Sequence, residues 1–295
     1  MSDPRRMPRQ LGAFLIDKEL WHGSHSTVYL ARDSRDSAAV ALKVLYASPE
    51  FPLEQQKRTA RREASRLKVL SHENIVPLRK HGEIDGLPYL SFPFIEGQGL
   101  DVICKANTVA LEPLLRALVK VCHALHHAHR QGILHRDLKP RNILIDQRVQ
   151  PYVLDWGLAW KMGDKSEGSV QSIVGTPAYM SPEQARGEEQ SLTPATDVYS
   201  LGAILYHVLT GKPPFEAGTS WKTMQMAMSL PPRPPSQLKT TVDLKMERVV
   251  LWALEKDPER RYASAESMAE DMQRALDNEK PRGPAGVLGR LFGRK

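Results

Sequence analysis

The segment that decides the fold reads HRDLKPRN at residues 135–142. This loop contains an acid, a cation and an amide, in Asp137, Lys139 and Asn142. A second acid, Asp155, follows Asn142 after 13 residues. Such a set can place a base and two metal ligands around one pocket. Phosphoryl transfer needs this set, because its transition state requires mainly positioning and charge neutralisation.

The composition is that of an ordinary globular chain. Its 295 residues are 41% apolar and 25% charged, which leaves room for one large domain or two modest ones. The two cysteines, Cys104 and Cys122, make neither a disulfide framework nor a metal set, which agrees with a reducing compartment.

The longest uncharged, mainly apolar run, residues 198–211, is shorter than the roughly 20 residues of a membrane-spanning helix. We therefore expect a cytoplasmic location. Association with a membrane through the C-terminal tail or through a segment beyond residue 295 stays open.

The ends of the chain carry its net charge of +7. Residues 1–10 hold +2 and residues 280–295 hold +5, so that residues 11–279 are formally neutral. Nucleic-acid binding needs a basic folded face, whereas the excess here lies in tails rich in Pro, Gly and Arg. We therefore expect no nucleic-acid partner. Contact of the basic tail with an anionic membrane stays a hypothesis, since each basic residue near such a surface contributes about 1 kcal/mol.

The order of predicted elements indicates an α+β chain in two parts. Short strand-like stretches occupy residues 14–47, a helical pattern follows at 52–70, and strand-like segments return at 75–78 and 87–95. Further along the chain, helices are predicted at residues 111–130, 196–209, 244–255 and 264–278. A small β-rich part with one helix, followed by a larger helical part, predicts two lobes that join near residue 96.

Several motifs in this order resemble those of the protein kinase family. They are HRDLKPRN, the tripeptide DWG at residues 155–157 and the stretch GTPAYMSPEQA at residues 175–185. The last of these is typical of bacterial eukaryotic-like (Hanks-type) serine/threonine kinases, and the resemblance extends over about residues 14–275. It implies a two-lobed protein kinase fold that binds ATP and Mg²⁺ between its lobes. The expected parts are a flexible basic arm at 1–13, an N-lobe at 14–95, a C-lobe at 96–279 and a flexible basic tail at 280–295.

The resemblance assigns roles to the charged residues of the loop. Asp137 matches the catalytic acid that accepts or orients the proton of the substrate hydroxyl. Lys139 would neutralise charge on the γ-phosphate. Asn142 and Asp155 match the two Mg²⁺ ligands.

The same resemblance locates the nucleotide site. Lys43 matches the strand lysine that holds the α- and β-phosphates, and Glu63, 20 residues later, is its expected ion-pair partner. Phe92 is the expected gatekeeper beside the adenine. Pro93 lacks an N–H, but its position offers only a carbonyl. The residues assigned to ATP binding are Gly23, Val28, Ala41, Lys43, Phe92, Pro93 and Ile95.

Acceptor choice and activation follow from the same segments. In the family, a lysine at the position of Lys139 accompanies serine or threonine acceptors, so the resemblance implies such acceptors here. Thr176 agrees with this, since its hydroxyl would bond to the pair formed by Asp137 and Lys139. Arg136 is expected to meet a phosphate on the activation segment, where the enzyme would phosphorylate itself. The available hydroxyls there are Ser172, Ser169 and Ser166, of which we expect Ser172 first.

Four residues are assigned a structural role by the resemblance, and Arg136 is one of them. Glu183 and Arg261 match a buried ion pair that ties the end of the activation segment to the larger lobe. Asp197 matches a helix acid that anchors the backbone of the loop at residues 135–142, called the catalytic loop below.

The phosphate loop departs from the family pattern. It reads WHGSHSTV at residues 21–28, and Gly23 alone remains of three glycines whose backbone N–H groups approach phosphate. Trp21 and Ser26 should stiffen or lift this loop. A pseudokinase scaffold with weak or no transfer is therefore the alternative function. His25 is interpreted as an exposed loop residue, with phosphate contact as the other hypothesis.

Two further features have competing interpretations. Trp156 replaces a phenylalanine of the family, and we expect it to fill the same hydrophobic position. His123 and His127 have the spacing of a zinc pair on a helix, but we interpret their segment as the helix that leads to the catalytic loop.

The partners implied by the resemblance are proteins with serine or threonine acceptors. A small-molecule phosphotransferase is disfavoured, since residues 175–183 match a segment that holds a peptide acceptor. Pairing of two copies of the chain stays a hypothesis.

Overall fold

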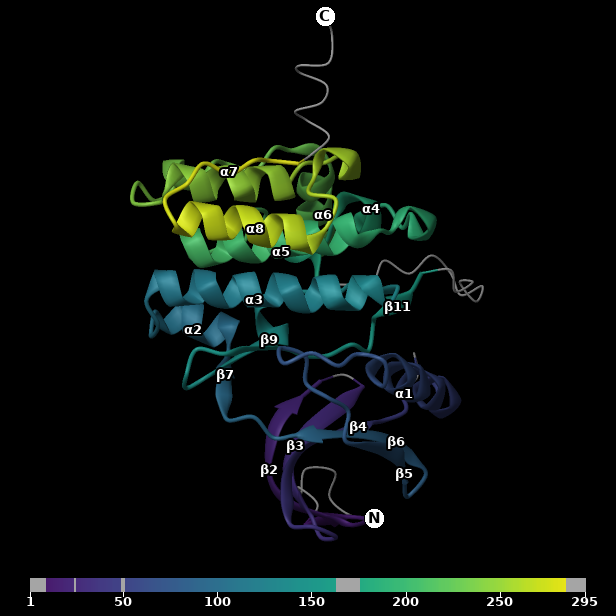
Figure 1. Ribbon diagram of the computed structural model, residues 1–295. Coiled ribbons are helices and arrows are strands. Elements are labelled where there is room, and N and C mark those ends of the chain that lie inside the picture. Colours follow the sequence, from purple (N-terminus) through teal and green to yellow (C-terminus); the bar gives the residue numbers. More distant parts are fainter. Residues whose placement is uncertain (1–8, 24, 49–50, 163–175, 285–295) are drawn as a thin grey trace, which may run out of the picture. The chain divides into compact units, whose positions relative to one another are not determined.

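The computed structural model describes residues 9–23, 25–48, 51–162 and 176–284. The described chain forms two compact units, of which the first extends to residue 71 and includes residues 75–96, and the second comprises residues 72–74 and those from 97 onward. An antiparallel sheet and the helix α1 build the first unit, and the second is mainly helical (Figure 1). The predicted α+β class is therefore confirmed.

The strands of the first unit form one antiparallel sheet in the order β1-β2-β3-β4-β6-β5. They are β1 (Gln10–Leu11), β2 (Phe14–His22), β3 (Ser26–Asp33), β4 (Ala38–Leu45), β5 (Lys80–Ile84) and β6 (Leu87–Pro93). On β4, Val40, Leu42 and Val44 are buried in one core together with Tyr29 of β3. Because side chains alternate along a strand, Lys43 lies on the other face of the sheet.

Helix α1 (Leu53–Leu67) packs against β5 and β6. Its buried residues include Ala60, Ala64 and Leu67, which recur at the spacing of one helix face. Glu63 is buried on the same side of the helix. A buried carboxylate is costly unless it is paired, so this position requires a cationic partner.

The predicted strand at residues 75–78 is wrong. Ile75 and Val76 are buried, but the sheet strand begins only at Lys80. The preceding residue, Asn74, donates from its side chain to the carbonyl of Pro151 over 2.8 Å, and its own carbonyl accepts from Val153 N–H over 2.8 Å. This anchoring leaves the apolar pair buried outside the sheet. The edge of β6 is instead paired with β5.

The second unit contains short strands and a stack of helices. The helices are α2 (Leu100–Ala106), α3 (Leu111–Arg130), α4 (Pro182–Ala185), α5 (Pro194–Thr210), α6 (Ser220–Ser229), α7 (Leu244–Ala253) and α8 (Ala265–Leu276). The strands are β7 (Gly97–Gly99), β8 (Ile133–Leu134), β9 (Ile143–Asp146), β10 (Pro151–Val153) and β11 (Trp160–Lys161). The observed bounds of α3 match the predicted helix.

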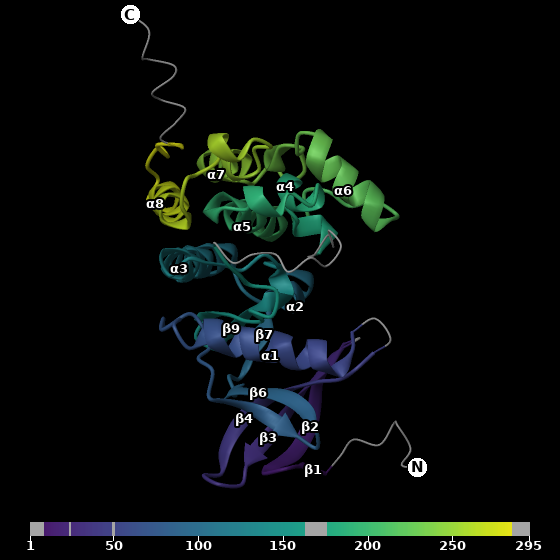
Figure 2. The same cartoon turned by 90° about the vertical axis from the view of Figure 1, so that its right-hand side faces the viewer.

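Helix α5 forms the centre of this stack. It contacts α3, α7 and α8, as Figures 1 and 2 show from two sides. Its described residues are buried around nearly the whole circumference, which is typical of a core helix. The catalytic loop follows β8, so it begins a few residues after the end of α3. Asp197, near the start of α5, accepts from the first backbone N–H of this loop. Within the described residues, no helix has the length and apolar character needed to cross a membrane.

The chain after α8 remains attached to that helix. Asp271, which is buried, accepts from the backbone N–H groups of Arg282 and Gly283 over 2.7 Å each and from the hydroxyl of Tyr262 over 3.0 Å. Residues 280–284, which the sequence assigns to the basic tail, therefore include a segment packed on the helical unit. The rest of that tail lies outside the described residues.

Candidate active site

In the first unit the structure places Lys43 against Glu63. The ammonium Nζ lies 3.2 Å from Oε1 and 3.1 Å from Oε2 of the carboxylate. Lys43 extends from β4, and Glu63 from the apolar face of α1, where its side chain is 1% exposed. The pair thus links the sheet to the helix and holds an ammonium group on the sheet face opposite the core of β4.

Residues assigned to ATP binding gather on that same face. Val28 is the cross-strand partner of Lys43, and Ala41 is the partner of Phe92. Directly opposed residues share a face, and so do residues two apart on one strand. Val28, Ala41, Lys43 and Phe92 therefore share one face. Pro93 pairs with Val40 and lies on the other face, and Ile95 follows the end of β6.

The phosphate loop between β2 and β3 is closed by its own contacts. Gly23 N–H donates to the carbonyl of Ser26 over 2.9 Å, and His22 Nδ1 lies 2.9 Å from Thr27 Oγ1. The indole of Trp21 covers Gly23, since a Cβ atom at that position would overlap the ring. Any side chain at Gly23 would displace Trp21, so the surviving glycine is needed for an aromatic contact within the loop.

His25 is partly buried, and its interpretation as an exposed loop residue is wrong. Its ring centroid lies 4.1 Å from that of Phe51, and its carbonyl accepts from Tyr46 N–H over 2.8 Å. These contacts attach the second half of the loop to the segment that follows β4. The sequence could not show this, because Phe51 is 26 residues away.

In the second unit the catalytic loop holds the Asp137 carboxylate among three donors, of which the Asn142 side-chain nitrogen, 3.5 Å from Oδ2, is the most distant. Lys139 Nζ lies 2.6 Å from Oδ2, and Thr176 Oγ1 donates to Oδ1 over 3.2 Å. Asn142 Nδ2 donates to the Asp137 carbonyl over 2.8 Å and closes the turn. Asp137 is only 7% exposed. The carboxylate is therefore held in one orientation, with a cation beside it and a hydroxyl opposite.

Asp197 anchors the start of this loop. Its buried carboxylate accepts from the N–H groups of His135 and Arg136 over 2.8 and 3.0 Å, and His129 Nε2 lies 2.8 Å away. Burial alone would raise the pKa of Asp197. The hydrogen bond from His129, its charge and that of His135, and the backbone N–H of Arg136 outweigh burial and lower the pKa below its ordinary value.

The structure places Asn142 and Asp155 on neighbouring segments, one directly before β9 and the other after β10. The N–H of Leu154 donates to the carbonyl of Asn142 over 2.8 Å. The Asn142 amide nitrogen is engaged with Asp137, which leaves its oxygen for a cation. Asp155 is exposed and has a φ of 57°, a left-handed conformation that costs about 1–2 kcal/mol for a residue other than glycine. One amide oxygen and one carboxylate are oxygen donors of the kind that Mg²⁺ takes, so the set fits this ion.

Arg136 also has a left-handed backbone, with a φ of 67°. Its guanidinium lies over the ring of Trp160 at 6.0 Å, and its Nε is buried with no hydrogen-bond partner among the described residues. Burial lowers the pKa of Arg136, although Glu189 and Asp197 oppose this effect. Ser166, Ser169 and Ser172, its expected phosphate carriers, lie outside the described residues.

Glu183 and Arg261 form a bidentate buried pair. Arg261 Nη1 lies 2.7 Å from Oε1 and Nη2 lies 2.8 Å from Oε2. The hydroxyl of Thr196 also donates to Oε1, over 2.9 Å. Burial would raise the pKa of Glu183, but its bonds to Arg261 outweigh this and lower it. The pair joins α4 to the segment before α8.

Sequence reasoning missed two residues of this network. No local signal joins His129 to Asp197, which is 68 residues away. Gln184 has a local signal, since Ser181 and Gln184 have the spacing of a capping box, and the structure contains this box. The side-chain nitrogen of Gln184 donates to the carbonyl of Arg136 over 2.7 Å.

A comparison with protein-family models matches residues 14–272 to the protein kinase domain. The chain belongs to the protein kinase family. It is 36% identical over 275 residues to the serine/threonine-protein kinase PknB of Mycobacterium leprae, and 37% identical over 276 residues to PknB of Mycobacterium tuberculosis strain H37Rv. Each alignment covers 90% of this chain and 43% of the relative. The chain thus spans less than half the length of these relatives.

The structure of this kinase domain also places Trp156 and His123, the two other residues interpreted from the sequence. Trp156 is 1% exposed, and its ring lies 4.7 Å from that of His135, so it fills a buried position beside the loop. His123 pairs with Glu266 of α8, with Nδ1 3.0 Å from Oε2. Among the described residues, no three His, Cys, Asp or Glu side chains are grouped closely enough to hold a metal ion.

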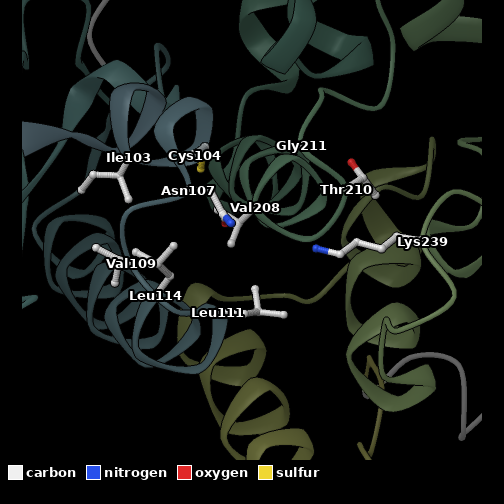
Figure 3. A pocket seen from close by; sticks show the side chains of 10 residues that line it. All are labelled: Ile103, Cys104, Asn107, Val109, Leu111, Leu114, Val208, Thr210, Gly211 and Lys239. Carbon is white, nitrogen blue, oxygen red and sulfur yellow. The ribbon is translucent and has the colours of Figure 1, made fainter.

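A cavity of about 120 Å³ lies elsewhere in the second unit, beside α2, α3 and the end of α5 (Figure 3). It is lined by Ile103, Cys104, Asn107, Val109, Leu111, Leu114, Val208, Thr210, Gly211 and Lys239. Burial raises the pKa of the Cys104 thiol to about 11, with a smaller contribution from Asp101, so the thiol is protonated at neutral pH. No residue assigned to catalysis is among those that line this cavity.

Proposed function

We propose that this kinase domain transfers the γ-phosphate of ATP to serine and threonine hydroxyls of proteins. The observation that carries this proposal is the Asp137 carboxylate, held between Lys139 at 2.6 Å and Thr176 at 3.2 Å on a loop anchored by Asp197. A fixed carboxylate beside a cation suits a reaction that is catalysed mainly by positioning and charge neutralisation. The family match and the serine/threonine kinases related to the chain support the same activity.

Each residue then has one task. Asp137 accepts or orients the proton of the acceptor hydroxyl, while Thr176 keeps the carboxylate turned toward that hydroxyl. Lys139 stabilises charge on the phosphoryl group in transfer. Lys43, held extended by Glu63, binds the α- and β-phosphates. Gly23, Val28, Ala41, Phe92, Pro93 and Ile95 would contact the rest of the nucleotide.

Asn142 and Asp155 would hold Mg²⁺ through the amide oxygen and the carboxylate. When bound, this ion neutralises charge on the phosphates of ATP. The two residues themselves fix where that charge is neutralised, since one precedes β9 directly and the other follows β10 in a left-handed conformation.

We propose in addition that the domain phosphorylates its own activation segment. The buried Nε of Arg136, which has no hydrogen-bond partner among the described residues, supports this, because a phosphate on Ser172 or Ser169 would supply the missing acceptor. Intact-mass measurement after incubation with ATP should show added phosphate, and the Ser169→Ala/Ser172→Ala double variant should show less.

The central test uses labelled ATP, Mg²⁺ and a generic basic protein acceptor. The wild-type chain should label serine and threonine of the acceptor, and Asp155→Asn should abolish the signal. Asp277→Asn is the matched control, since this exposed aspartate is bonded to Gln273 and lies outside the site. Equal labelling by wild type and Asp155→Asn, or labelling by neither, would refute the proposed activity.

The pseudokinase alternative is favoured by one observation, the indole of Trp21 over the single remaining glycine of the phosphate loop. It predicts saturable ATP binding without transfer to any protein acceptor. A nucleotide titration run beside the labelling assay separates the two functions, because the enzyme must show both.

Two partner hypotheses concern other surfaces. For the basic tail, the segment up to residue 284 packs on α8, so the deletion should begin at residue 285. If the tail contacts membranes, a smaller fraction of the truncated chain than of the full chain should sediment with anionic vesicles. Equal fractions for the two chains would reject that contact. Sedimentation equilibrium tests whether two copies pair.

A further inference from the structure

The side chain of Gln184 is buried and every polar group in it is engaged. It is 6% exposed on α4. Its Oε1 lies 3.2 Å from Ser181 N and 3.2 Å from Ser181 Oγ, and its Nε2 donates to the Arg136 carbonyl over 2.7 Å. The orientation of the amide is determined by chemistry. A backbone N–H can only donate and a carbonyl can only accept, so the oxygen must face Ser181 and the nitrogen must face Arg136.

The group that Gln184 binds is the peptide between Arg136 and Asp137. Arg136 has a left-handed φ of 67°, a conformation that persists in a residue other than glycine only where the surroundings hold it. Its N–H is held by Asp197 Oδ1 over 3.0 Å. Its carbonyl is held by Gln184. On the far side of the same peptide, the N–H of Asp137 has only a long bond of 3.3 Å to His135 Nδ1.

The segment at residues 176–184 is thus bonded to the catalytic loop at both ends. Thr176 donates to the Asp137 carboxylate at one end, and Gln184 donates to the Arg136 carbonyl at the other. All of this segment except Gln184 belongs to residues 175–183, which are expected to hold the acceptor. The two bonds therefore couple its conformation to the orientation of two consecutive residues of the loop.

We propose that Gln184 is a positioning residue for phosphoryl transfer, which holds the peptide before Asp137 so that its carboxylate faces the acceptor hydroxyl. This inference rests on the proposed function of Asp137. It does not require Gln184 to contact ATP or the acceptor. Its loss should therefore lower kcat and leave the KM for ATP nearly unchanged.

The variant Gln184→Glu tests this proposal, because it replaces the side-chain N–H donor with a carboxylate oxygen, which is an acceptor. Its carboxylate can still accept from Ser181, but its second oxygen would face the Arg136 carbonyl, and two acceptors repel. Loss of a buried bond and a small misplacement of Asp137 should lower kcat by about 5- to 50-fold at about pH 8, with the KM for ATP changed less than about 2-fold.

The kcat of the same variant should recover, relative to that of wild type, as the pH is lowered. A buried carboxyl that faces a carbonyl has a raised pKa, and once protonated its O–H can donate to Arg136 as the amide did. The ratio of Gln184→Glu kcat to wild-type kcat should therefore rise by about 3-fold or more as the pH falls from about 8 to about 6. A residue that only supported the fold would leave kcat, expressed per folded molecule, close to that of wild type at both pH values.

Two further variants control this experiment. Gln184→Met has a similar size and no donor, so its kcat should be low at both pH values. Ser181→Ala removes the capping hydroxyl but leaves the bond to Arg136, and its kcat should stay within about 2-fold of wild type. Thermal unfolding of each variant shows which ones are folded. If Gln184→Glu does not fold, Gln184→Met carries the test.

The outcomes separate this inference from the proposed function. If wild type transfers phosphate, and both Gln184 variants match its kcat at both pH values, the inference is overturned and the function stands. A fall in kcat that is the same for Gln184→Glu at both pH values also overturns it. Failure of wild type to transfer phosphate refutes the function and, with it, this inference.

Discussion

The catalytic loop and the phosphate loop of this kinase domain differ in the kind of group that each holds in place. In the catalytic loop these groups are charged side chains, and the Asp137 carboxylate is held by Lys139 and Thr176. In the phosphate loop, the family uses the backbone N–H groups of three glycines, of which Gly23 remains. Here Trp21 covers that glycine. A missing charge cannot be replaced by packing, whereas a backbone conformation can be held by other side chains. The first loop should therefore be intolerant of change and the second tolerant.

The largest effect should come from Asp137→Asn. The substitution keeps the size of the side chain and removes its basicity, so kcat should fall by about 10³-fold, within the range for loss of a general base. Initial rates with a saturating protein acceptor measure this. A decrease of less than about 10-fold would show that the carboxylate does not have this role.

The next effect concerns stability rather than chemistry. Arg261→Met leaves Glu183 buried without its cation, which should cost about 3–5 kcal/mol in the free energy of unfolding. Arg260→Met is the matched control, since the side chain of Arg260 is 68% exposed and lies 3.7 Å from Asp257. Denaturant unfolding of both variants gives the comparison. Similar losses in both would contradict a special role for the buried pair.

The pH dependence of stability follows from this pair and from the buried Asp197. The pKa values of Glu183 and Asp197 are lowered in the folded chain, so their stabilisation is complete above the ordinary carboxyl pKa of about 4 and is lost as the pH falls through the folded values. In Arg261→Met the unpaired Glu183 should have a raised pKa instead. The difference in unfolding free energy between wild type and variant should therefore shrink from about pH 7 to about pH 4. A constant difference would contradict this.

A smaller loss of activity should follow from Lys43→Met. It removes the ammonium that Glu63 holds at 3.1 Å, and kcat/KM for ATP should fall by about 10²-fold. Lys80→Met is the control within the same sheet, because Lys80 also pairs with a buried acid, Asp33, at 2.7 Å. The control should lose stability and keep its kcat. If Lys43→Met and Lys80→Met lowered kcat/KM for ATP equally, Lys43 would have no specific role in ATP binding.

The smallest effect is expected in the phosphate loop. Gly23→Ala forces the Trp21 indole away and should raise the KM for ATP by about 3- to 10-fold. Trp21→Ala alone should change it by less than about 3-fold. In the double variant the clash is absent, so the two effects should not add. Additive effects would show that the indole does not pack on Gly23 in solution.

The sequence could predict the elements whose signals are local. The catalytic loop carries its acids, cation and amide within a short span, and the regular apolar spacing of α3 predicts its observed bounds. The strand expected at residues 75–78 was wrong, because Asn74 binds Pro151 and Val153 far along the chain, and no local pattern contains such a bond. The bonds of His129 to Asp197 and of Gln184 to Arg136 were missed for the same reason.

The most direct measurement follows phosphate on the acceptor by mass spectrometry, after incubation with ATP, Mg²⁺ and either the wild-type chain or Asp137→Asn. With wild type, phosphate should appear on serine and threonine of the acceptor. With the variant, it should be nearly absent over the same time. Phosphate that accumulates equally with both proteins, or with neither, would contradict the claim that Asp137 and the groups around it transfer the γ-phosphate of ATP.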